Sequence, residues 1–178
     1  MYPALPQAKG DPMISKKIEK ALNDQIQREL HSGYVYLSMS AYSQQINLKG
    51  FAQWMRLQSA EERGHALRLF DYLIDCGGTV ALQSIEKPPQ TFKSARQMFE
   101  VALESEQEIT RQIHRIYKLA KDESDYATEV ELQWFIREQV EEENTTEEIL
   151  NRLKLVGNQP AGLYMIDREL GARQQSGH

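Results

Sequence analysis

The stretch from Gln58 to His65 places polar side chains where a buried helix needs apolar ones. Apolar residues before and after it recur at spacings of three and four, which is the pattern of one buried helix face. Glu62 and His65 continue that face through its middle, one helical turn apart. A buried carboxylate is strongly destabilising unless a partner compensates its charge. The sequence therefore predicts a helix whose buried face needs a counter-charge.

The chain has 178 residues, of which 40% are hydrophobic and 26% are charged, which is typical of one soluble globular domain. Its formal net charge of -5 disfavours nucleic acid as a partner. The single cysteine, Cys76, excludes an intrachain disulfide framework and a thiolate metal site. No run approaches the roughly 18 apolar residues of a membrane span. We expect residues 1–12, which lack the apolar segment of a secretory signal, to form an N-terminal extension, and residues 13–178 to form one cytoplasmic domain.

Helical periodicity divides the domain into four long segments and one short one. The predicted helices cover about residues 14–43, 51–76, 92–120, 125–156 and 163–170. The linker 78–91 contains Pro88 and Pro89 and has no helical stripe. Fully extended, it spans about 46 Å, which exceeds the roughly 39 Å length of the second helix. The second and third helices can therefore run parallel, and we predict an all-α four-helix bundle with one long crossover and a short fifth C-terminal helix.

Charged or amide side chains interrupt the apolar stripe of every long segment. In the first segment, which Ser15 is expected to cap, Glu29 falls on the stripe that we trace through Ile18, Leu22, Ile26, Leu30, Gly33 and Leu37. In the third segment Glu106 is the one charged member of an otherwise unbroken stripe, and in the fourth the central members are Gln139 and Glu142. These positions form an internal repeat with an offset of 77 residues, which relates Glu29 to Glu106, Glu62 to Gln139 and His65 to Glu142.

Two halves of this kind place six metal-ligating side chains at one level of a shared core. A single carboxylate on an apolar stripe is more often a satisfied surface residue, and a lone histidine is more often a core residue than a ligand. Polar side chains at matched spacing on four separate stripes are hard to explain by coincidence, so the pattern favours a metal site. Its four glutamates carry four negative charges, which two divalent cations would balance. Oxygen-rich ligation with one imidazole suits Fe(II) or Mn(II) better than structural zinc.

The same residues carry a resemblance to a known family. From about Met13 onward the chain resembles bacterial and archaeal non-haem ferritins, through Arg28–Tyr36, Ala60–His65, Arg68–Leu73, Glu104–Gln107, Leu132–Phe135, Glu138–Glu143 and Gly162–Asp167. The resemblance implies a ferritin-like di-iron domain that belongs to a homo-oligomeric shell of 24 subunits. It implies ferroxidase activity, in which Fe(II) is oxidised by O2 and stored as a ferric mineral.

The resemblance also assigns roles to particular residues. Glu29 and His65 would hold the first iron, Glu62 would bridge the pair, and Glu106 and Glu142 would hold the second. Gln139 would lie beside the second iron and help to position the oxidant. Tyr36, seven residues after Glu29 and on the same face, would donate an electron or a hydrogen bond. Trp134 resembles a family tryptophan near the site, although its spacing of five from Gln139 predicts that it points elsewhere.

Two further expectations come from comparison within the family. Bacterial members have a third, looser iron site, which Glu61, Glu138 and Glu141 match; from the residues alone these are equally well a solvated acidic face. Bacterioferritins repeat Glu-x-x-His in both halves and use a methionine to bind haem. The second half here is Gln139-x-x-Glu142 and no methionine occupies the neighbourhood of Arg63 and Gly64, so we expect no haem.

Two other functions remain open. A ferritin-like di-iron peroxidase or oxidase of the rubrerythrin kind would share the bundle, but the chain lacks a cysteine-rich rubredoxin-type domain. A non-catalytic shell subunit that only hosts mineral would typically lack ligands equivalent to Glu62 and His65. A plain structural bundle is disfavoured by the charge count.

Overall fold

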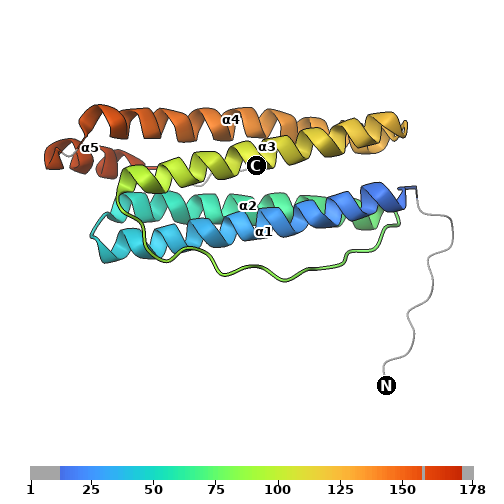
Figure 1. Cartoon of the computed structure of the whole chain (residues 1–178), viewed down its shortest axis with the longest axis horizontal. Helices are drawn as coiled ribbons and strands as arrows, with labels where there is room; N and C mark the ends of the chain where they lie inside the picture. Colours follow the sequence, from blue (N-terminus) through green and yellow to red (C-terminus); the bar gives the residue numbers. More distant parts are fainter. Residues whose placement is uncertain (1–12, 158, 174–178) are drawn as a thin grey trace, which may run out of the picture.

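The computed structural model describes residues 13–157 and 159–173, and the described helices confirm the predicted bundle. The helices are α1 (Lys16–Gln45), α2 (Lys49–Asp75), α3 (Ala95–Asp122), α4 (Tyr126–Val156) and α5 (Pro160–Leu170). The four long helices lie side by side with their axes nearly aligned, and the short α5 packs at one end of the bundle (Figure 1). The N-terminal extension predicted for residues 1–12 lies outside the described residues.

The segment between α2 and α3 is the long crossover that its length predicts. It runs the full length of the bundle beside α1, so that α2 and α3 point in the same direction (Figure 1). Its backbone is fixed to α1 along the way: Asn23 donates to the carbonyl of Thr79 at 2.9 Å, and Tyr42 donates to the carbonyl of Phe92 at 2.5 Å. The crossover thus binds to the surface of α1 as an extended strap.

Local capping explains where the helices begin and end. Ser15 accepts a hydrogen bond from the amide of Ile18, as predicted, and Gly77 follows α2 with a φ of 74°. The third helix begins at Ala95, three residues later than predicted, because the Ser94 hydroxyl caps it by accepting from Gln97. The fifth begins at Pro160 and not at residue 163, since proline is favoured in the first helical turn.

The start of α2 is capped by a residue more than a hundred positions away. Leu48, which precedes the helix, offers no side-chain cap. Instead, Asp167 of α5 accepts hydrogen bonds through Oδ1 from the amides of Gly50 at 2.8 Å and Phe51 at 3.0 Å. Ile166 and Leu170 are buried beside this contact. The short fifth helix is therefore attached to α2 by both a cap and apolar packing.

Polar side chains divide the apolar core into two clusters, one toward each end of the bundle. One contains Tyr36, Trp54 and Phe99, and the other contains Ile18, Leu69 and Ile113. One predicted stripe member is wrong: Leu37 is 46% exposed, whereas Tyr36 is 1% exposed and fills the core position. Every long helix contributes to both clusters and carries its buried glutamate or glutamine between them.

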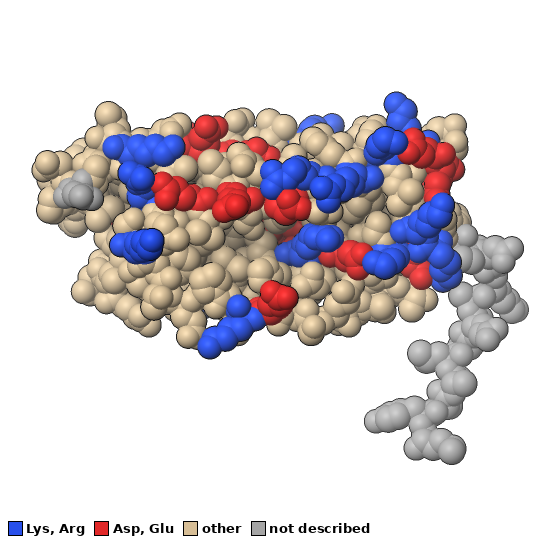
Figure 2. All heavy atoms as spheres, viewed as in Figure 1, with Lys and Arg blue, Asp and Glu red and all other residues tan. Residues whose placement is uncertain are grey.

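The outer surface differs in character from this core. On the face shown in Figure 2, acidic and basic side chains are interspersed along the bundle and are not separated by sign. Several form ion pairs within one helix, such as Lys20 with Asp24 and Lys118 with Asp122. None of the described helices combines the length and the apolar character that crossing a membrane requires.

Candidate metal centre

The six side chains that the repeat predicts meet midway along the bundle. Helix α1 supplies Glu29, α2 supplies Glu62 and His65, α3 supplies Glu106, and α4 supplies Gln139 and Glu142. None is more than 6% exposed. Burial of four carboxylates and an imidazole between two apolar clusters creates an unusually polar layer in an otherwise apolar core.

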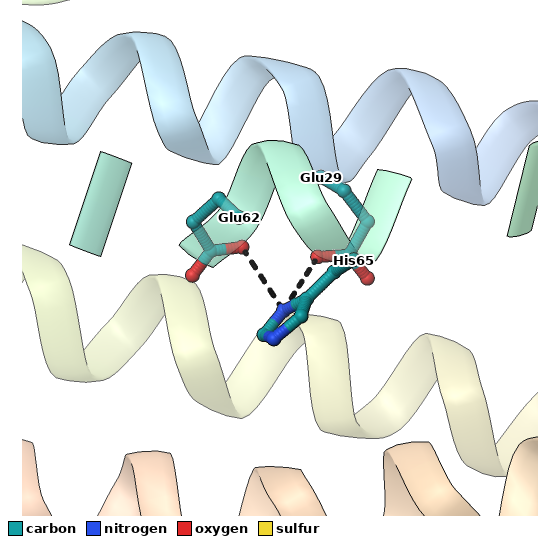
Figure 3. Close-up of side chains that lie close together, drawn as sticks. All are labelled: Glu29, Glu62 and His65. Atoms are coloured by element: carbon teal, nitrogen blue, oxygen red, sulfur yellow. Dashed lines mark ion pairs between the residues drawn. The ribbon is translucent and has the colours of Figure 1, made fainter. Parts of the chain in front are cut away.

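One half of this layer is formed by Glu29, Glu62 and His65. The Nδ1 atom of His65 lies 3.8 Å from Glu29 Oε2 and 3.9 Å from Glu62 Oε2 (Figure 3). One ligand atom from each residue falls within 4.8 Å of the others. Among the described residues, neither oxygen of Glu62 has a hydrogen-bond partner, and the same holds for Glu29 Oε2 and His65 Nδ1. Buried polar atoms are rarely left in this state, so the arrangement fits a cation.

The other half is held by hydrogen bonds. Tyr36 donates to Glu106 Oε1 at 2.6 Å, and Gln139 donates to Glu106 Oε2 at 3.3 Å. Gln58 donates to Glu142 Oε2 at 2.8 Å. The first half has fewer such donors: Gln25 donates to Glu29 Oε1 at 2.7 Å, but Glu29 Oε2 and both oxygens of Glu62 have no partner among the described residues.

Burial and mutual repulsion favour the protonated form of three carboxyl groups in the layer, those of Glu62, Glu106 and Glu142. Burial raises the pKa of Glu62 well above its usual value, and the charges of Glu106 and Glu29 raise it further. The pKa of Glu142 rises to about 8, first through burial and then through Glu106. Burial also raises the pKa of Glu106, against the lowering effect of the hydrogen bond from Tyr36. Without cations, protons compensate the charge that the sequence leaves unbalanced.

Burial acts on the pKa of the imidazole in the opposite sense. Burial alone lowers the pKa of His65, but the adjacent Glu29 carboxylate outweighs this effect and the pKa is raised. Tyr36 has a pKa well above its usual value, because of its burial and of the nearby Glu106 charge. Tyr36 is therefore a hydrogen-bond donor to the layer across the physiological pH range.

The three outer glutamates are not brought together in the same way. Glu138 lies near the centre: its carboxylate, with His65 and Glu142, forms a second group of ligand atoms within 4.8 Å of one another. Glu61 forms an ion pair with Arg173, at 2.8 Å from Nη2 to Oε2. Glu141 is exposed on α4. Neither Glu61 nor Glu141 belongs to a ligand group among the described residues.

A cavity of about 800 Å³ between α2 and α4 reaches His65 from the side. Its lining also includes Glu61, Glu138, Arg68 and Trp134. The Trp134 ring lies edge-on to His65, with 5.4 Å between centroids, so the expectation that Trp134 points elsewhere is wrong. Arg68 stacks on Trp134 at 4.1 Å and pairs with Glu131. Trp134 lies beside the core stripe of α4, on the side facing α2. Its position near His65 therefore cannot be predicted from that stripe alone.

Comparison with known proteins agrees with the fold. A family model described as the ferritin-like domain matches residues 19–156. The chain is 40% identical over 161 residues to the bacterial non-heme ferritin of Bacteroides fragilis, covering 90% of this chain and all of that protein. It is 37% identical to the bacterial non-heme ferritin of Staphylococcus aureus, covering 90% of this chain and 97% of that one.

A solved structure shares the same architecture. The open pore ferritin of the archaeon Archaeoglobus fulgidus superposes with a TM-score of 0.90 at 43% identity, covering 92% of this chain and all of that chain. The fold and the buried carboxylate–imidazole layer define a ferritin-like four-helix bundle. The chain belongs to the ferritin family, and its relatives are non-heme ferritins.

Proposed function

We propose that the protein is an iron-storage ferritin subunit with ferroxidase activity, which oxidises Fe(II) with O2 at a di-iron centre within one subunit. The observation that supports this most is that, in the described part of the chain, neither buried oxygen of Glu62 nor the nearby Nδ1 of His65 has a hydrogen-bond partner. Hard, oxygen-rich ligation with one imidazole suits iron in both oxidation states. Each Fe(II) that is oxidised gives up one electron to O2, and the ferric product hydrolyses and releases protons.

The residues have distinct roles in this proposal. Glu29 and His65 bind the first Fe(II), Glu62 is shared between two ions, and Glu106 and Glu142 bind the second. Gln139 and Tyr36 keep Glu106 oriented through the hydrogen bonds that they donate to it. Because Glu62, Glu106 and Glu142 have raised pKa values, entering cations displace protons from them.

The looser third iron site at Glu61, Glu138 and Glu141 stays a prediction. Its best supported member is Glu138, whose carboxylate lies near ligand atoms of His65 and Glu142. Glu138 and His65 both line the cavity between α2 and α4. Haem is not part of the proposal. We further propose that the subunits assemble in the cytoplasm into a homo-oligomeric shell of 24 copies, which holds ferric oxide-hydroxide inside.

Aerobic addition of Fe(II) to the apoprotein tests the catalytic proposal. We expect rapid formation of ferric absorbance, and loss of this fast phase in Glu62→Ala. Glu131→Ala is the matched control, because Glu131 is a glutamate on the cavity wall that contacts Arg68 and not the buried layer. An unchanged fast phase in Glu62→Ala would exclude the assigned site.

The alternatives predict different outcomes. A peroxidase of the same fold would oxidise Fe(II) far faster with H2O2 than with O2 and would retain no mineral. A non-catalytic shell subunit would take up mineral without any fast phase. Size-exclusion chromatography adds a second criterion, because a monomer or dimer of the 20.6 kDa chain would remove the storage role.

A further inference from the structure

Arg173, which follows α5, returns to the middle of α2 and contacts three of its side chains. Its Nη2 lies 3.0 Å from Glu61 Oε1 and 2.8 Å from Glu61 Oε2. Its Nη1 donates a short hydrogen bond to Gln58 Oε1. Its guanidinium carbon lies 5.2 Å from the centre of the Trp54 ring. A planar guanidinium with three separate partners is held in one orientation.

Gln58 connects Arg173 to the metal centre. A guanidinium only donates hydrogen bonds, so the Gln58 amide must direct its oxygen toward Arg173 and its NH2 group the other way. That NH2 group donates to Glu142 Oε2 at 2.8 Å. Gln58 is fully buried. Arg173 is thus separated from Glu142 by one side chain, and it fixes the orientation of the Gln58 NH2 group that donates to Glu142.

Glu61 connects Arg173 to the same carboxylate through charge. Glu61 adjoins Glu62 in sequence, and its charge is one of the causes, after burial and Glu106, that raise the pKa of Glu142. It also lines the cavity that reaches His65 and Glu138. A free Glu61 carboxylate would therefore add an oxygen ligand to the edge of the group formed by His65, Glu138 and Glu142. Arg173 occupies both of its oxygens.

We propose that Arg173 is a positioning residue that acts as an internal cation, holding Glu61 out of the metal-binding set. A cation that binds between Glu61 and Glu138 must first displace the guanidinium. The C-terminal segment therefore weakens cation binding at the third site predicted at Glu61, Glu138 and Glu141, and loss of Arg173 strengthens binding there. This inference rests on the proposed function, because it assumes that the buried groups bind metal.

Titration of the full-length apoprotein with Co(II), followed by calorimetry and visible absorption, tests the role of Arg173. In Arg173→Gln we expect Co(II) to bind at Glu61 and Glu138 roughly fivefold or more tightly than in the wild type, because a partly exposed ion pair is worth about that factor. The Arg173→Lys variant keeps the positive charge but loses the planar guanidinium group. Its Co(II) titration curve should therefore lie close to that of the wild type. In the double variant Arg173→Gln/Glu61→Gln the gain should disappear.

Arg152→Gln is the matched control. Arg152 forms an ion pair with Glu169 of α5, so this variant loosens the same helix without touching Glu61. Equal titrations of Arg173→Gln and the wild type, a gain that persists in the double variant, or an equal gain in Arg152→Gln would each overturn the proposal. If Glu62→Ala binds Co(II) as the wild type does, the proposed function fails and this inference fails with it.

Discussion

Tyr36 of α1 donates a 2.6 Å hydrogen bond to Glu106 of α3 at the centre of the bundle. The two residues are 70 positions apart, and both are almost completely buried. The contact joins helices from the two halves of the internal repeat. It also stabilises the ionised form of a carboxylate whose burial favours the protonated form.

The first prediction concerns this hydrogen bond. In Tyr36→Phe, Glu106 loses its strongest donor, so its pKa should rise and Fe(II) should compete less well with protons. A lost hydrogen bond of about 1 kcal/mol corresponds to roughly fivefold slower initial oxidation of Fe(II) at neutral pH, measured by stopped-flow absorbance. Tyr42→Phe, which removes a bond to the crossover, is the control and should oxidise Fe(II) at the wild-type rate. Equal rates in both variants would argue against the role given to Tyr36.

The second prediction concerns the pH dependence of stability in the apoprotein. Glu142 has a pKa of about 8 in the folded state and a usual value of 4.5 when unfolded. Between these values the folded state binds more protons than the unfolded state, so the free energy of unfolding falls as pH rises. The raised pKa values of Glu62, Glu106 and His65 act in the same direction.

Thermal unfolding at a series of pH values, with and without Co(II), measures this effect. We expect the apoprotein to lose stability from about pH 5 to pH 8. The stabilisation by Co(II) should grow over the same range, because metal ions replace the protons. Glu142→Gln should show a shallower loss with pH, and an apoprotein that gains stability over this range would contradict the assigned pKa directions.

The core positions of α1 show what periodicity predicts and what it misses. Repeated steps of four residues drift around a helix with 3.6 residues per turn. Leu37 is 19 residues after Ile18 and is rotated by about 100° from it, whereas Tyr36 lies five full turns away on the same side. The buried polar layer was nevertheless predictable, since charged or amide side chains at matched positions of four stripes are recognised without an accurate boundary for any helix.

The support around that layer was not predictable in the same way. Arg173 contacts Glu61 across 112 positions, and it lies after the last helix, where no periodic pattern indicates the direction of the chain. The cap that Asp167 provides for α2 was unpredictable for a similar reason. The sequence shows that the Leu48 side chain cannot cap this helix, but it does not show which distant residue does. Contacts made by segments after a turn depend on how whole helices pack.

The third prediction tests this distant cap. A Cβ atom on Gly50 would lie 1.6 Å from the carbonyl oxygen of Asp167, so Gly50→Ala must displace α5 from α2. We expect a loss of about 2 kcal/mol in the free energy of unfolding, within the range of overpacked sites. Gly64→Ala, on the same helix, adds a Cβ atom that no atom of the described residues approaches within 4 Å, so it should gain about 0.5 kcal/mol through lower backbone entropy. Similar midpoints of denaturation for the two variants would contradict the docking of α5.

The last prediction separates function from stability at Glu62. Its carboxylate is 1% exposed and has no hydrogen-bond partner among the described residues, and its pKa is well above the usual value. In the apoprotein this group opposes folding at any pH at which an unfolded glutamate is ionised. Glu62→Gln has nearly the same shape and carries no charge. We therefore expect the Glu62→Gln apoprotein to be more stable than the wild type at pH 8, by about 1 kcal/mol or more.

The same substitution should greatly reduce the stabilisation of the folded state by a bound metal ion. A neutral amide is a weaker ligand for a hard cation, so Co(II) should raise the unfolding temperature of Glu62→Gln much less than that of the wild type. Glu131→Gln, which removes an ion pair on the cavity wall, should change neither quantity appreciably. A destabilised Glu62→Gln apoprotein with an undiminished response to Co(II) would mean that Glu62 stabilises the fold by itself. The opposite pair of results would mean that the sequence keeps an unfavourable buried charge because a metal ion neutralises it.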